Sequence, residues 1–84
     1  MYRVLYEKKA QKFLRKAAVN QRDLIMRKID EYALNPDLGC NVIKMRGVDA
    51  YRMRVGDWRV IFEKRDDVLL ILVLDIGSRG GIYQ

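Results

Sequence analysis

The sequence predicts an α+β fold in the order β-α-α-β-β-β, with a two-helix hairpin packed on one face of a small, mainly antiparallel sheet. Three patterns support this prediction. Apolar residues recur at helical spacing between residues 7 and 34, residues 51–63 alternate between apolar and polar, and a continuous apolar run follows at 68–74. Because nothing else in the chain can bury the apolar face of the strands, both helices are expected on that face.

The first half of the chain reads as one strand followed by two helices. Residues 2–6 alternate weakly and predict the strand. Residues 7–18 then carry an apolar stripe at the spacing of one buried helix face, formed by Ala10, Phe13, Leu14, Ala17 and Ala18. Basic residues fill the rest of this helix, and we interpret most of them as a solvated face: Lys8, Lys9, Lys12, Arg15 and Lys16. Charge alone would still attract the phosphates of a nucleic acid.

The second helix is expected to begin near Asn20, which with Asp23 resembles a weak capping arrangement, and to end at Asn35-Pro36. Its apolar face would comprise Leu24, Ile25, Ile29, Tyr32 and Ala33. A connection of about two residues predicts an antiparallel helical hairpin. Residues 37–41 are expected to form a loop, residues 42–45 to extend or pair briefly, and residues 46–49 to turn into the next strand.

Residues 51–63 predict a β-hairpin, because Gly56-Asp57 separates two alternating runs. Counting outward from this pair sorts the side chains onto two faces. One face is apolar or aromatic throughout, with Tyr51, Met53, Val55, Trp58, Val60 and Phe62. The other face carries Arg52, Arg54 and Arg59 with Ile61. Arg54 then faces Arg59, and like charges directly opposite one another destabilise a strand pair. This cost favours an anionic ligand over ordinary solvent exposure.

Residues 64–67 predict a turn, and the apolar run 68–74 predicts a strand covered on both faces. The register of this strand against the hairpin is open. An odd register places Asp75 on the helix side of the sheet, and an even register places it among the arginines. We favour the even register, because a buried, unpaired carboxylate is costly. Residues 76–84 are expected to form a glycine-rich tail that carries Arg79 and Tyr83.

The composition predicts one domain over residues 1–84 and restricts its chemistry. Cys40 is the only cysteine and histidine is absent, which argues against a disulfide, a zinc site and a Cys/His nucleophile. Neither a metal nor a cofactor is expected. The start of the chain shows no apolar signal segment, and the longest apolar run is too short to span a bilayer. We therefore expect a cytoplasmic protein without a membrane partner.

The formal net charge of +6 indicates a polyanionic partner such as nucleic acid. Arginine binds phosphate through two parallel hydrogen bonds and can stabilise the extra charge of a phosphoryl-transfer transition state. In RNA the 2′-hydroxyl can serve as the nucleophile, so a protein need only align it and absorb charge. Because the pKa of arginine stays above about 12, it is a poor general base. Such a nuclease would depend on a larger body to preorganise its substrate.

The chain resembles the RelE/ParE superfamily of bacterial and archaeal toxins, most specifically in residues 44–47, 51–63 and 76–83. The resemblance is strongest to the RelE branch, whose members cleave messenger RNA in the ribosomal A site and are inhibited by a RelB-like antitoxin. It therefore implies a toxin of a type II toxin-antitoxin system with an antitoxin, the ribosome and mRNA as partners, in a hetero-oligomeric toxin-antitoxin complex.

The resemblance also implies roles for individual residues. Arg52 and Arg54 match a basic pair, usually lysines, that is associated with proton transfer and substrate binding. Arg59 and Arg79 match arginines that hold the scissile phosphate, and Tyr83 matches a tyrosine that orients the RNA or stacks on it. Lys44 and Arg46 are assigned to RNA binding. Ser78 stands where many relatives carry histidine, so the identity of a general base is open.

Two other functions fit part of the pattern. A ParE-like toxin would inhibit DNA gyrase by binding it and would catalyse nothing, and the hairpin motif occurs in both branches. Arg79 and Tyr83 favour the nuclease. A nucleic-acid-binding module without activity fits the charge, but it accounts less well for a rigid arginine cluster.

Overall fold

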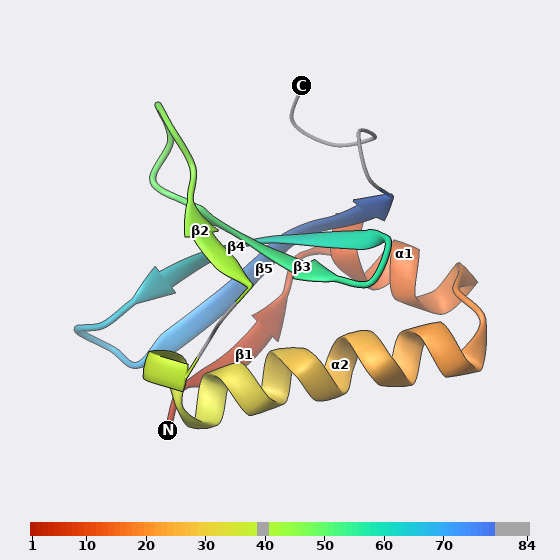
Figure 1. Cartoon of the computed structure of the whole chain (residues 1–84), viewed down its shortest axis with the longest axis horizontal. Helices are drawn as coiled ribbons and strands as arrows, with labels where there is room; N and C mark the ends of the chain where they lie inside the picture. Colours follow the sequence, from red (N-terminus) through yellow and green to blue (C-terminus); the bar gives the residue numbers. More distant parts are fainter. Residues whose placement is uncertain (39–40, 79–84) are drawn as a thin grey trace.

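The computed structural model describes residues 1–38 and 41–78. Its elements, in chain order, are β1 (Arg3–Tyr6), α1 (Lys8–Lys16), α2 (Val19–Leu34), a short 3-10 turn η1 (Pro36–Leu38), β2 (Val42–Lys44), β3 (Tyr51–Val55), β4 (Trp58–Arg65) and β5 (Leu70–Ser78). Figure 1 shows the helices and the sheet. The predicted α+β order is confirmed, and residues 42–44 add a short paired strand to it. No helix within 1–38 or 41–78 has the length and apolarity needed to cross a membrane.

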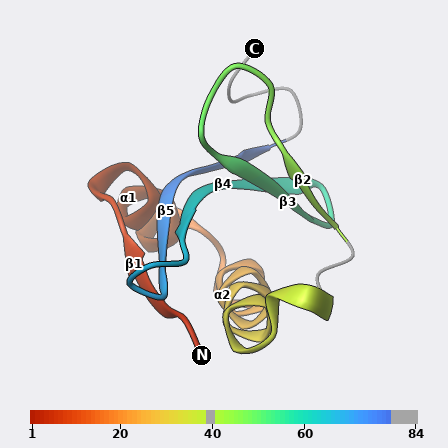
Figure 2. The ribbon, with the colours of Figure 1, turned by 90° about the vertical axis from the view of Figure 1, so that its left-hand side faces the viewer.

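The strands form one mixed sheet in the order β1-β5-β4-β3-β2. β1 pairs with β5 in parallel, and every other neighbouring pair is antiparallel. Figure 2 shows α2 end-on below β3 and β4, with α1 beside β1 and β5. The sheet is thus covered by helices on one side, as the apolar stripes require.

The β3–β4 hairpin has the predicted register, with Val55 opposite Trp58 and Arg54 opposite Arg59. Gly56 has a φ of 58°, and Asp57 is not among the residues with positive φ. A glycine of positive φ at the first of two loop positions is typical of a type II′ turn, whose twist matches that of the strands. The local dipeptide therefore determines which side chains face the helices.

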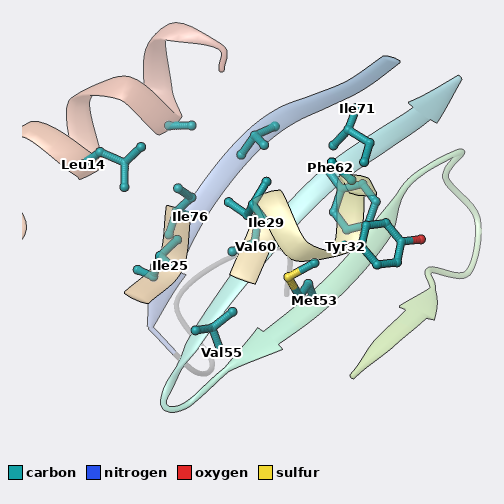
Figure 3. Packing of buried hydrophobic residues seen from close by; sticks show 13 residues of the cluster. Leu14, Ile25, Ile29, Tyr32, Met53, Val55, Val60, Phe62, Ile71 and Ile76 are labelled. Carbon is teal, nitrogen blue, oxygen red and sulfur yellow. The ribbon is translucent and has the colours of Figure 1, made fainter. Parts of the chain in front are cut away.

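The core lies between the helices and the apolar face of the sheet (Figure 3). Phe62 is at its centre, with an edge-on contact to Tyr32 at a centroid distance of 5.3 Å and a stacked contact to Tyr51 at 5.6 Å. Each such aromatic pair contributes about 1 kcal/mol beyond simple burial. The face of the hairpin that was predicted to be apolar is the face that the core buries.

Three local expectations are wrong. Asn20 does not cap α2, because the helix begins at Val19 after Ala18, which makes no side-chain capping hydrogen bond. The turn after β4 is also displaced, since β4 continues to Arg65 and β5 begins at Leu70. Residues 76–78, expected in the tail, belong to β5. Hydrogen bonding to β4 decides this, because Ser78 is the ladder partner of Trp58 at the first position of β4.

Candidate nucleic-acid interface

The predicted arginine cluster lies on the sheet face opposite the core, and we call this surface the arginine face. Residues directly opposite each other in a ladder project to the same side of a sheet. One row across the sheet is Arg54, Arg59 and Gly77, on β3, β4 and β5. The next row begins on β2 and reads Ile43, Arg52, Ile61 and Asp75. The arginines therefore come from two adjacent, hydrogen-bonded strands.

The arginine face combines solvent-accessible arginines with a buried apolar side chain. Arg54 is exposed, whereas Arg52 and Arg59 are half-buried. Ile61, which lies between Arg52 and Asp75 in the second row, is completely buried. Guanidinium groups that extend from strands are held more precisely than groups on a loop. This arrangement suits recognition of a phosphate backbone.

Asp75 introduces a negative charge at this surface. The even register that we favoured is confirmed, because Asp75 pairs with Ile61 after a bulge in the β4–β5 ladder. Its side chain is nonetheless buried, and it has two partners. The backbone N–H of Ile76 donates to Oδ1 at 2.8 Å, and Lys9 Nζ on α1 lies 3.1 Å from Oδ2. The sequence pattern assigned Lys9 to a solvated helix face, and no local signal predicts a partner so distant in the chain.

The two residues assigned to RNA binding lie in different places. Lys44 pairs with Tyr51, so its register places it on the helix side of the edge strand β2 and not on the arginine face. Arg46 lies in the exposed loop that the hydrogen bond from Met45 N to Ala50 O closes. This loop rises on the side of the sheet away from α2 (Figures 1 and 2). Arg79 and Tyr83 are outside the described residues.

A second polar cluster lies at the other end of β4. The Tyr2 hydroxyl donates to Asp66 Oδ1, and Lys64 Nζ is 2.8 Å from the same oxygen. The hydrogen bonds from Lys64 and then Tyr2 hold the pKa of Asp66 below its usual value. They join the start of β1 to the β4–β5 turn.

The shallow cavity near this cluster does not resemble an RNA site. It measures about 480 Å³ and is lined by four carboxylates and two cations: Asp49, Glu63, Asp66, Asp67, Lys64 and Arg65. A net negative lining repels phosphate. Within the described ranges, no three His, Cys, Asp or Glu side chains gather to hold a metal ion. The arginine face is therefore a better candidate for RNA binding than this cavity.

The fold and the hairpin motif agree with comparisons to known proteins. The model of the family described as the ParE toxin of the type II toxin-antitoxin system, parDE, matches residues 2–83. The chain belongs to this family. This match confirms the RelE/ParE superfamily resemblance that was inferred from the motifs. We refer to the protein below as the ParE-family toxin. A search of curated proteins by sequence found no match.

Solved structures place the ParE-family toxin close to RelE proteins in fold. It is similar to the archaeal RelE-RelB complex from Pyrococcus horikoshii OT3, with a TM-score of 0.82 and 29% identity over 95% of this chain and 97% of that chain. It is also similar to the RelB-RelE complex from Methanococcus jannaschii, with a TM-score of 0.72 and 27% sequence identity over 94% of each chain. The intact E. coli RelBE complex matches with a TM-score of 0.78 and 23% sequence identity over 94% of this chain and 98% of that chain. At this level of identity the similarity concerns the fold alone.

Proposed function

We propose that this toxin is a ribosome-dependent mRNA endoribonuclease that cleaves in the A site. The observation that carries the proposal is the arginine face, with Arg52, Arg54 and Arg59 on two adjacent strands in a fold shared with RelE proteins. Arginines directly opposite one another lower stability. A ligand with closely spaced phosphates explains why the chain carries them.

In the proposed reaction the 2′-hydroxyl attacks the adjacent phosphate, and the bond to the 5′-oxygen of the next nucleotide breaks. The arginines of the face bind the phosphate and stabilise its additional charge in the transition state. By resemblance, Arg79 supplies a further phosphate contact and Tyr83 orients the RNA. The ribosome holds the message in the reactive pose, which reduces what the toxin must supply in acid-base chemistry. Action on the ribosome implies the cytoplasm.

We also propose a RelB-like antitoxin as the partner of this toxin, in a hetero-oligomeric complex. The similar proteins from Pyrococcus horikoshii OT3 and Methanococcus jannaschii were solved with RelB. Charge complementarity gives such a complex its specificity. The antitoxin is therefore expected to bring acidic side chains to the arginine face and to compete there with RNA.

The second candidate function is inhibition of DNA gyrase by binding, without catalysis. It is favoured by one observation, the match of residues 2–83 to the ParE toxin family. Two assays on the same preparations of the purified protein distinguish the nuclease from the gyrase inhibitor. One maps the 5′ ends of a reporter message after translation in vitro, and the other measures supercoiling by purified gyrase.

The translation assay compares the wild type with Arg59→Ala, Arg79→Ala and Tyr83→Phe, and with Arg27→Ala on α2 as a control of equal charge. Removal of one group that stabilises the transition state is expected to slow cleavage by about 100-fold, whereas Arg27→Ala leaves it unchanged. Equal cleavage by all variants would contradict the residue roles. Absence of cleavage by the wild type, with inhibited supercoiling, would replace the nuclease by the gyrase inhibitor.

A further inference from the structure

Helix α1 lies beside β5 beyond the point where β1 ends (Figure 2). Tyr6, the last residue of β1, pairs with Val73, and the N–H of Glu7 donates to the carbonyl of Val73 at 2.9 Å. The chain then enters α1, which lies beside β5 in Figure 2. The first turn of α1 is thereby brought to the segment of β5 that contains Asp75.

The pair formed by Lys9 and Asp75 is strongly asymmetric in exposure. The side chain of Asp75 is 6% exposed and that of Lys9 is 74% exposed, at an Nζ–Oδ2 distance of 3.1 Å. The carboxylate is thus held by the strand, while the ammonium group is in contact with solvent. An ammonium group has three donors, so an ion pair with one carboxylate oxygen of Asp75 leaves donors available to a second anion.

The register places the anchor of this pair on the arginine face. Asp75 lies in the same row as Ile61 and Arg52, so its carboxylate draws the Lys9 ammonium to the margin of that face nearest α1. We propose that Lys9 is an additional phosphate contact for RNA at the arginine face, and that Asp75 is the positioning residue that holds it there. The inference rests on the proposed function in that the ligand is RNA.

The role of Asp75 can be separated from simple charge. Asp75→Asn removes a negative charge from the RNA-binding side, so electrostatic attraction alone predicts tighter binding. If Asp75 positions Lys9, the same substitution releases the ammonium group and weakens binding. The asparagine oxygen can still accept the hydrogen bond from Ile76 N–H. The two explanations therefore predict changes of opposite sign.

The test measures binding of a short fluorescent single-stranded RNA by anisotropy over a series of salt concentrations, without ribosomes. Each phosphate contact contributes about 0.7 to the slope of log affinity against log salt. Lys9→Gln and Asp75→Asn are each expected to lower the slope by about this amount, and the double variant by no more than either one. Lys9→Arg is expected to restore the slope.

Lys16→Gln is the matched control, because it removes the same charge from the same helix about 10 Å away. Thermal unfolding verifies that each variant is folded, and if Asp75→Asn is not, the exposed Lys9 variants and Lys16→Gln decide. Equal slopes for Lys9→Gln and Lys16→Gln, or tighter binding by Asp75→Asn, would overturn the inference even if the wild type cleaves message on ribosomes. Salt-independent binding by the wild type would overturn it as well. Loss of the Lys9 contact in a protein that binds RNA but cleaves no message would support it while the nuclease proposal fails.

Discussion

Arg54 and Arg59 lie directly opposite one another on β3 and β4. The hairpin could form with a neutral or oppositely charged pair at this position, and such a pair would be more stable. A structural position that lowers stability in this way is typical of functional surfaces, where activity and stability compete.

Replacement of Arg54 by threonine is expected to raise the free energy of unfolding by about 0.5 kcal/mol, because it removes the cross-strand repulsion. The same variant is expected to bind single-stranded RNA more weakly, with a salt slope lower by about 0.7. Denaturant unfolding and anisotropy measure the two effects. Arg54→Lys keeps the charge and serves as the control. A variant that is less stable and binds RNA as the wild type does would contradict the functional explanation.

Gly56→Ala is expected to lower the free energy of unfolding by about 1 kcal/mol, since the φ of 58° at this position is unfavourable for any residue with a Cβ. No atom outside the turn lies within 4 Å of the added methyl group, so the cost is conformational and not steric. Asp57→Ala, at the second position of the same loop, is expected to change stability much less. Denaturant unfolding of both variants tests this, and equal losses would show that the turn assignment is wrong.

Tyr6→Phe is expected to stabilise the protein by about 1 kcal/mol at neutral pH, because the Tyr6 hydroxyl is buried without a hydrogen-bond partner among the described residues. Burial, followed by the negative charge of Asp30, raises the pKa of Tyr6 to about 12. The unfolded chain loses this proton near pH 10, so the wild type loses stability as the pH rises from about 10 to 12. The variant should lack this component of the alkaline loss. Urea unfolding at neutral and alkaline pH measures both effects, and a destabilised variant would indicate a hidden partner for the hydroxyl.

Asp66→Asn is expected to reduce stability at neutral pH and to have little effect in acid. Its ion pair with Lys64 and the hydrogen bond from Tyr2 lower its pKa from 3.8. The folded state therefore gains stability from the ionised form above that value and loses it as the pH falls through the lower, folded-state pKa. Unfolding measured from neutral to strongly acidic pH should show the two proteins converging. Asp67→Asn, at the next residue, is the control, and the same behaviour in both variants would argue against a specific role for Asp66.

Much of the fold could be predicted because its signals are local. The dipeptide Gly56-Asp57 alone determined the register of β3 against β4, and with it the division between core face and arginine face. The start of β5 could not be predicted in the same way. Val68 and Leu69 are apolar and β-prone, yet both are exposed in the turn, and Leu69 has a φ of 50°. The strand begins where β4 and β1 provide partners, and an apolar run does not contain that information.

The candidate site likewise has some features that local sequence predicts and others that depend on distant contacts. Arg52, Arg54 and Arg59 could be assigned to one surface from the amino-acid sequence, since alternation along a strand and the length of a turn are properties of neighbouring residues. The folded structure was needed to establish that Asp75 lies on that surface, that Lys44 faces the other side, and that Lys9 on α1 pairs with Asp75. These relationships depend on ladder registers and on the packing of α1 against β5. They arise from contacts between distant parts of the chain, which local periodicity does not encode.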